Sequence, residues 1–284
     1  MRAQWILWLL LVGAAGCTFS DGGPFAELES TILEARLIEA PGRGAGDGWQ
    51  RLNTDYQARF DVFVLDTAGL TLQRTQAGSG GGGGGTFDPA NPPPRYSNCH
   101  SGHCHRDDGA LVDFEDIQAE MDGGGGGPTV VSVVSFRGES LDLVEGTRRS
   151  LICAECDLPE GGASQLRMPL TRLLLRGAIR DGRTEERLAG EVPFSLDLTF
   201  TEEEQAVVAA SLDLPADRSQ PPRVSLELSL ELTSALVDNV DWAALAKNAD
   251  GISLGEDANS DARALILQQL MEIEMATKIS RTSD

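Results

Sequence analysis

Alternation of apolar and polar residues with a period of two is the dominant pattern along the chain. Residues 192–200 and 224–232 show it most clearly, because Val, Leu or Phe stands at every second position. Such a segment forms a strand with one apolar face, as in an antiparallel sheet that covers a core. Further strand candidates are residues 31–39, 58–66, 129–136, 172–179 and 206–214. Since no segments of helical period separate them, we expect a mainly β fold, an antiparallel β-sandwich.

Helical spacing is found in two places. Apolar residues recur at this spacing from residue 261 to 279, behind Asn259 and Ser260, which are typical helix caps. We therefore predict that residues 259–284 form a C-terminal amphipathic helix that packs on the sandwich. A shorter helix is expected at residues 113–121, where apolar residues fall on one face.

Two glycine runs, at residues 80–85 and 123–127, interrupt the strand pattern. Runs of this kind are typical of flexible linkers, and an insertion as long as the one between them is uncommon without a function. We divide the chain after residue 16 into four parts: lipid-anchored N-terminus and first strands (17–79), Gly-flanked Cys/His-rich insertion (80–127), remainder of the sandwich (128–258) and C-terminal helix (259–284).

The first sixteen residues have the pattern of a secretory signal peptide. Arg2 precedes an apolar run over residues 5–12, and small residues follow directly before Cys17. The run is shorter than the roughly 20 residues that a membrane-spanning helix needs. We therefore expect residues 1–16 to be a signal peptide.

Ala14-Ala15-Gly16-Cys17 resembles the bacterial lipobox. The resemblance implies that the signal is cut before Cys17 and that Cys17 carries the lipid anchor. The match departs from the family at Ala14, where Leu is preferred. Thr18, in place of a retention-signal Asp, implies an outer-membrane lipoprotein, periplasmic or surface-exposed. The alternative is an ordinary secreted protein in which Cys17 is a free thiol.

The chain is strongly acidic, with a formal net charge of −21 and a pI near 4.4. Nucleic acids and anionic lipids are bound through clustered Lys and Arg. The charge therefore argues against a nucleic-acid partner, and the predicted contact with a membrane is the lipid anchor.

Cysteine and histidine are concentrated in the insertion. It holds all three histidines of the chain and two of the four cysteines other than Cys17: Cys99, His100, His103, Cys104 and His105. The other two cysteines form a C-x-x-C motif, Cys153 and Cys156. Two sulfurs at this spacing can share a tetrahedral ion, and imidazoles add nitrogen ligands suited to zinc or copper. We predict a zinc or copper site in which the four cysteines are the core ligands and one of the histidines replaces a sulfur.

Disulfides are the competing interpretation, because thiols are oxidised outside the inner membrane. Four cysteines allow three pairings. Pairing within each motif gives two local bridges, whereas pairing between the motifs would pin the insertion to the sandwich and stabilise it by about 4 kcal/mol. Thiolate ligation and disulfides both stay open. With oxidised cysteines, the histidines would remain as ligands, alone or with Asp107 or Asp108.

A covalent haem is a third, less favoured interpretation. Cys99-x4-Cys104-His105 is a stretched relative of the C-x-x-C-H attachment motif, with His105 as proximal ligand and Met121, Met168 or His100 as the distal one. The standard spacing is absent.

The last third of the chain, from the strand at 192–200 through Leu236-Val237-Asp238-Asn239-Val240-Asp241-Trp242, resembles the second half of periplasmic methanobactin-associated copper-binding proteins and of related β-sandwich lipoproteins. The resemblance implies a sandwich architecture. Because no histidine lies in this part, the copper ligands of that family have no counterpart here.

These features predict an envelope lipoprotein that binds a transition-metal ion for structure, storage or delivery. The alternative is a structural or interaction lipoprotein with two disulfides and an envelope protein as partner. We do not expect an enzyme, because the chain has no Gly-x-Ser-x-Gly elbow and no phosphate-binding loop.

Overall fold

The computed structural model describes residues 25–76, 87–90, 92–93, 96–106, 110–122, 129–184, 188, 190–201, 206–246, 250–255 and 257–283. The predicted signal peptide and Cys17 lie outside these residues, as do both glycine runs, Asp107 and Asp108. Among the described helices, none combines the length and the apolar composition needed to cross a membrane.

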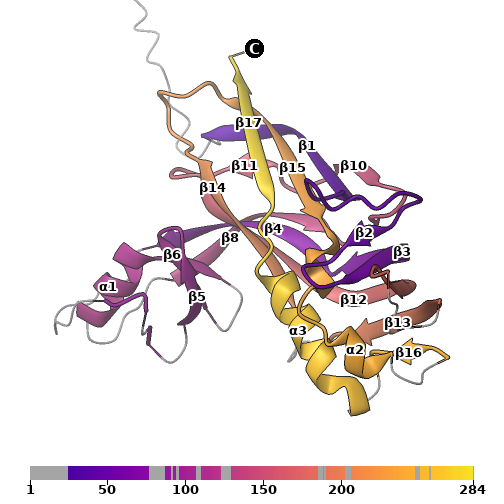
Figure 1. Cartoon of the computed structure of the whole chain (residues 1–284). Coiled ribbons are helices and arrows are strands. Elements are labelled where there is room, and N and C mark those ends of the chain that lie inside the picture. Colours follow the sequence, from indigo (N-terminus) through magenta and orange to yellow (C-terminus); the bar gives the residue numbers. More distant parts are fainter. Residues whose placement is uncertain are drawn as a thin grey trace, which may run out of the picture.

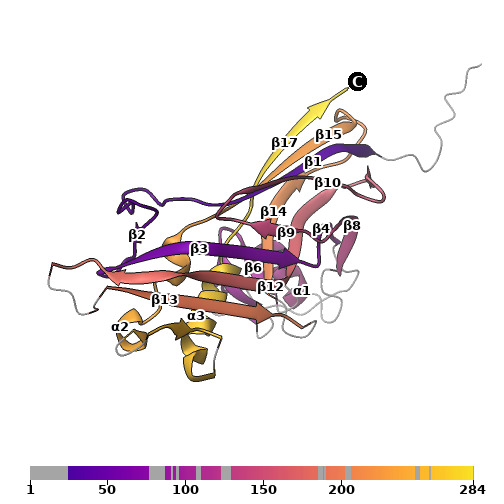
Figure 2. The ribbon, with the colours of Figure 1, turned by 90° about the vertical axis from the view of Figure 1, so that its right-hand side faces the viewer.

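Two sheets form the body of the molecule. The first has the strand order β10-β1-β15-β17, with β11 beside β1. Its strands are β1 (Ala26–Leu37), β10 (Thr147–Leu151), β11 (Asp157–Leu158), β15 (Arg223–Leu232) and β17 (Ala276–Thr282). It lies above the strands of the second sheet in both views of the chain (Figures 1 and 2).

The second sheet is larger and is built around β12. Its main order is β16-β13-β12-β3-β2, and β14, β4, β8 and β9 branch from it. Its strands are β2 (Gln50–Arg51), β3 (Tyr56–Thr67), β4 (Gly69–Gln76), β8 (Thr129–Arg137), β9 (Ser140–Asp142), β12 (Ala163–Asp181), β13 (Glu191–Thr199), β14 (Val207–Leu214) and β16 (Ile252–Ser253). Both sheets contribute to one hydrophobic core.

The predicted alternation explains how the strands face this core. In β15 the five apolar residues at alternate positions are all buried: Val224, Leu226, Leu228, Leu230 and Leu232. The residues between them are half-buried or exposed. In β13, Phe194 packs against Trp242 with ring centroids 5.2 Å apart, which joins this strand to the segment that follows β15. The mainly β, sandwich-like fold is therefore confirmed.

The strand β12 extends further than the predicted residues 172–179. Its first part pairs with β14 and β4, and its second part pairs with β13 and β3. The register with β3 shifts between Arg176 and Gly177. A Cβ atom at position 177 would lie 2.0 Å from the carbonyl oxygen of Arg59, so the close approach of the two strands requires glycine there.

The sandwich is not antiparallel throughout. β1 runs parallel to β15, and β13 runs parallel to β16. A parallel pair requires a long connection between its strands, and about two-thirds of the chain separates β1 from β15. Alternation reveals that a strand has one buried face but gives no information on the direction of its neighbour.

The C-terminal helix is present but shorter than predicted. α3 covers Ser260–Met271, and β17 (Ala276–Thr282) pairs antiparallel with β15. The prediction that the helix covers residues 259–284 was wrong beyond Met271, because the last strand satisfies its backbone hydrogen bonds on the outer edge of the first sheet. Three short helical segments complete this part: η1 (Ser234–Val237), α2 (Trp242–Leu245) and η2 (Asp257–Asn259).

The insertion forms a small sheet of its own beside the body (Figure 1). It contains β5 (Tyr96–His100), β6 (His103–Arg106), β7 (Leu111–Asp113) and α1 (Phe114–Asp122), which matches the helix predicted at 113–121. Its buried residues form a separate cluster: Tyr96, Cys104, Ala110, Val112 and Ile117. The backbone N–H of Leu111 donates a buried 2.8 Å hydrogen bond to Oε1 of Gln165 in β12, so the insertion contacts the body.

Candidate metal centre

A tight turn between β5 and β6 brings the histidines together. Ser101 and Gly102 connect the two strands, and both have positive φ, 49° and 93°. A two-residue turn with two positive φ values matches the twist of a β-hairpin. It places His100 directly opposite His103 in the strand pairing.

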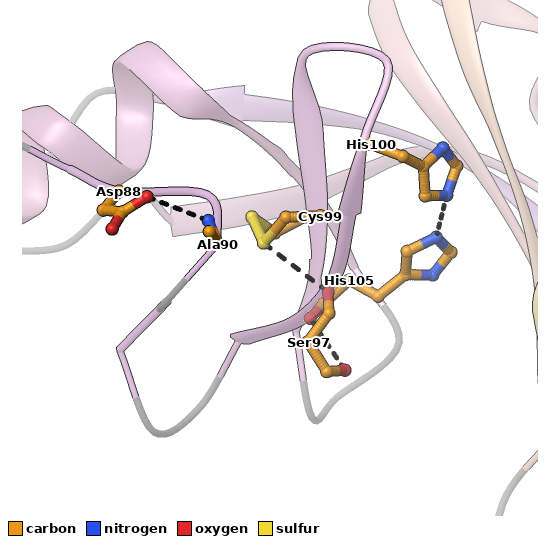
Figure 3. The surroundings of a disulfide bond; sticks show 7 residues. Asp88, Ala90, Ser97, Cys99, His100 and His105 are labelled. Carbon is orange, nitrogen blue, oxygen red and sulfur yellow. Dashed lines mark hydrogen bonds between the residues drawn. A yellow bond between two sulfur atoms is a disulfide. The ribbon is translucent and has the colours of Figure 1, made fainter.

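The strand period separates histidines from cysteines. Along β6, His103 and His105 are two residues apart and share a face, while Cys104 between them points to the other face and is fully buried in the core of the insertion. Figure 3 shows the rings of His100 and His105 on one side of the hairpin and the sulfur of Cys99 on the other. The cluster of the sequence is therefore divided into a face of imidazoles and a face of sulfur.

The four cysteines form two local disulfides, Cys99–Cys104 and Cys153–Cys156. Cys99 and Cys104 lie on the paired strands β5 and β6, with Cα atoms 4.0 Å apart. In this state the four sulfurs are bonded to each other and none is a thiolate, so the predicted ligand set of Cys99, Cys104, Cys153 and Cys156 is not formed. The pairing that would pin the insertion to the sandwich is not formed either.

A carboxylate from a distant part of the chain completes the cluster. Glu274 lies between α3 and β17, where it forms a parallel bridge with Ala209 of β14. Its Oε1 is 2.9 Å from Nε2 of His103, whose side chain is almost fully buried. One ligand atom from each of His100, His103, His105 and Glu274 lies within 4.8 Å of the others, so these residues could hold a metal ion.

The spacing of these atoms is close to that of a metal site. Bonds of about 2.0–2.2 Å to one tetrahedral ion place neighbouring ligand atoms about 3.4 Å apart. Nε2 of His105 lies 3.3 Å from Nε2 of His100. Nε2 of His103 makes no hydrogen bond within the described residues, although Glu274 Oε1 is 2.9 Å away. The lone pair or N–H of this nitrogen therefore does not point directly at Glu274 Oε1. This geometry is expected when the nitrogen and the carboxylate oxygen both point at a third position, where an ion would lie.

The surroundings favour the neutral form of His105. Burial lowers the pKa of His105 from its ordinary value of 6.5, and the positive charges of protonated His103 and His100 lower it further. The negative charges of Glu274 and Glu272 oppose this effect but are weaker. A neutral imidazole is the form that binds a metal ion. The pKa shift therefore keeps His105 available as a ligand near neutral pH.

Sequence patterns identified His100, His103 and His105 as candidate ligands but did not identify Glu274. The chain has 44 acidic residues, and no local pattern distinguishes Glu274 from the others. The hairpin had a recognisable signal, since Ser-Gly between two strand-like segments is typical of a two-residue turn.

The structure does not form the predicted covalent haem site. Both sulfurs that a covalent haem would need are held in the Cys99–Cys104 disulfide. Met168, one of the residues predicted as the distal ligand, is fully buried in the core of the body.

Searches against protein-family models, curated proteins and solved structures gave no match to this chain. The resemblances to the lipobox and to methanobactin-associated copper-binding proteins therefore stay predictions.

The lowered pKa of His105 predicts a pH dependence of stability in the absence of metal. The unfolded chain binds more protons than the folded one between the folded-state pKa and the ordinary value of 6.5. The contribution of His105 is therefore present above pH 6.5 and is lost as the pH falls through the folded-state pKa. We expect the urea midpoint of the wild type, with a chelator present, to fall more steeply between about pH 7 and pH 5 than that of His105→Gln. Superimposable profiles would contradict this.

Proposed function

We propose that this protein binds one transition-metal ion, zinc or copper, through His100, His103, His105 and Glu274. The observation that carries the proposal is the convergence of all three histidines of the chain with a carboxylate from a remote segment. Three imidazoles and one carboxylate form a donor set that suits zinc or copper, whereas calcium and magnesium prefer oxygen ligands. Four protein ligands leave no open position on a tetrahedral ion, which favours binding over catalysis.

The origin of the ligands indicates what a bound ion would do. The histidines belong to the insertion, and Glu274 belongs to the body. The contact between the two parts includes the partly buried Val130 of β8, which packs against the hydrophobic cluster of the insertion. Its hydrogen bonding is incomplete, since Nε2 of Gln165 is buried without a hydrogen-bond partner among the described residues. An ion shared by both parts would hold the insertion against β14. We therefore favour a structural role of the ion over storage or delivery.

We further propose that the protein is an envelope lipoprotein anchored through Cys17, with the outer membrane as its location. Support comes from the signal-like N-terminus and its lipobox resemblance. The two disulfides add an independent argument, because such bonds persist in the oxidising compartments outside the inner membrane.

The interaction-protein alternative retains one supporting observation, the two disulfides. It is compatible with metal binding, because Cys104 points away from the face that carries His103 and His105. A metal-stabilised insertion could present a rigid surface to an envelope partner.

Replacing Glu274 should weaken metal binding. Loss of a residue that only hydrogen-bonds to a ligand lowers metal affinity by roughly 10- to 100-fold. We expect Glu274→Gln to lower the affinity for Zn²⁺ or Cu²⁺ by more than this, and His103→Ala to lower it further, because each removes a ligand atom. Isothermal titration of the metal-free protein measures this, with elemental analysis for stoichiometry. Glu272→Gln is the matched control, because it removes the same charge two residues away without removing a ligand. Equal affinities of the Glu274→Gln and Glu272→Gln variants would exclude Glu274 as a ligand.

The Cys99–Cys104 disulfide should support the same site by fixing β5 against β6. We expect Cys99→Ser/Cys104→Ser to bind Zn²⁺ roughly 10-fold more weakly, because the histidines on the two strands lose their fixed spacing. Cys153→Ser/Cys156→Ser is the control and should bind like the wild type, because none of its atoms belongs to the ligand group. If both double variants bind equally well, the first disulfide has no positioning role.

Lipidation can be tested separately from metal binding. In a bacterial host fed an alkyne-tagged fatty acid, we expect the wild-type chain to be labelled and to partition into detergent. Cys17→Ala should be unlabelled, because the acylated sulfur is missing. An unlabelled wild-type chain would identify an ordinary secreted protein instead.

A further inference from the structure

The second disulfide, Cys153–Cys156, lies next to a groove of about 570 Å³ that has no part in the metal centre. The groove is lined by the end of β8, by the end of β10 and by the loop that follows β10. Its lining includes Phe136, Leu151, Ile152 and Cys153. Ile152 is 81% exposed, which is the largest exposure among the large hydrophobic residues that the structure describes as exposed.

Outer strands border this groove. β10 ends the strand order of the first sheet, with β1 as its neighbour, and β8 ends a branch of the second sheet, with β4 as its neighbour. A single bridge between Phe136 and Cys153 joins the two borders. Both strands lie on the right-hand side of Figure 2. Outer strands offer backbone N–H and C=O groups to an added strand, so the groove suits an extended polypeptide.

The two cysteines of this disulfide differ in their access to the groove. Both are half-buried and pack against the main hydrophobic core, but Cys153 lines the groove and Cys156 lies outside its lining. Ala154 and Glu155, between the two cysteines, are exposed. A bridge that spans three residues closes a very short loop, so it restricts the unfolded chain little and contributes little as a structural crosslink. Disulfides that a thiol can reach are the ones that exchange, and Cys153 borders an open groove.

We propose that Cys153–Cys156 is a thiol–disulfide exchange site whose substrate is a cysteine thiol on an extended polypeptide segment. The segment lies along β8 and β10, with an apolar side chain against Ile152. Its thiolate attacks Sγ of Cys153, the Cys153–Cys156 bond breaks, and Cys156 leaves with the electron pair and takes a proton from water. A second thiol of the partner, after losing its proton, attacks the partner sulfur of the mixed disulfide. Cys153 is released and protonated, so two partner thiols become a disulfide and the protein becomes a dithiol.

The chain contains its own control for this proposal. Cys104 of the other disulfide is fully buried in the core of the insertion, and neither Cys99 nor Cys104 lines the groove. If the groove directs the exchange, the thiol should react with Cys153 and not with Cys99 or Cys104.

The test measures the reaction of the purified full-length protein with two thiols, glutathione and a peptide of about twelve residues with alternating Val and Thr and one central Cys. Rates are compared at equal thiolate concentration, and products are quenched with acid and mapped by mass spectrometry. We expect the peptide to react at Cys153 about 10-fold faster than glutathione. A peptide with Pro at alternate positions, which cannot supply the backbone N–H groups, should react at the rate of glutathione.

Two variants and a control substitution test the proposal further. Cys156→Ser leaves Cys153 as a thiol, so this variant is given the peptide as its disulfide-linked dimer. The Cys153 thiolate should attack the peptide disulfide, release one peptide thiol and accumulate a stable mixed disulfide, because the Cys156 sulfur that would re-close the bridge is missing. Ile152→Ser should lower the reaction rate of the peptide and leave the reaction rate of glutathione unchanged. Val144→Ser, at an exposed site outside the groove, is the control and should change neither rate. The proposal is overturned if the wild type reacts no faster with the peptide than with glutathione, if the peptide attaches at Cys156, Cys99 or Cys104, or if Ile152→Ser leaves both rates unchanged.

Discussion

Pairing along both halves of β12 is the constraint on which the rest of this structure depends. The strand joins β14 and β4 at one end to β13 and β3 at the other, so the branches of the larger sheet share one backbone. Its first half also carries Gln165, which accepts the hydrogen bond from Leu111 of the insertion. A change in the register of β12 would move its side chains to the opposite faces and would separate the insertion from the body. The position of the histidines relative to Glu274 therefore depends on a strand that contributes no ligand.

The insertion shows how one hairpin can combine two chemistries that compete in the sequence. Sulfur and imidazole would compete for one ion if they shared a face. The period of two in β6 directs Cys104 into a hydrophobic core and His103 towards Glu274, so oxidation of the cysteines leaves the imidazoles unaffected. A disulfide and a metal site thus stabilise different contacts: the first holds the hairpin together, and the second would hold the hairpin against the body.

The two disulfides differ in environment although both close short loops. Cys99–Cys104 connects adjacent strands of the insertion, and Cys104 is shielded from solvent. Cys153 borders an open groove between two outer strands. Since thiol exchange depends on access to the sulfur atom, this difference assigns a structural role to the first disulfide and a chemical role to the second.

The sequence alone determined the features that depend on local periodicity. Alternation predicted the buried faces of β13 and β15, and helical spacing predicted α1 and the start of α3. The three histidines were identified as candidate ligands, although the four cysteines named as the core ligands are in disulfides. Tertiary structure decided what depends on neighbours distant in the chain: the parallel pairing of β1 with β15, the last strand β17 and the choice of Glu274. The physical reason is that periodicity reports which face of an element is buried, whereas strand partners and metal ligands are selected by contacts that form only when the chain is folded.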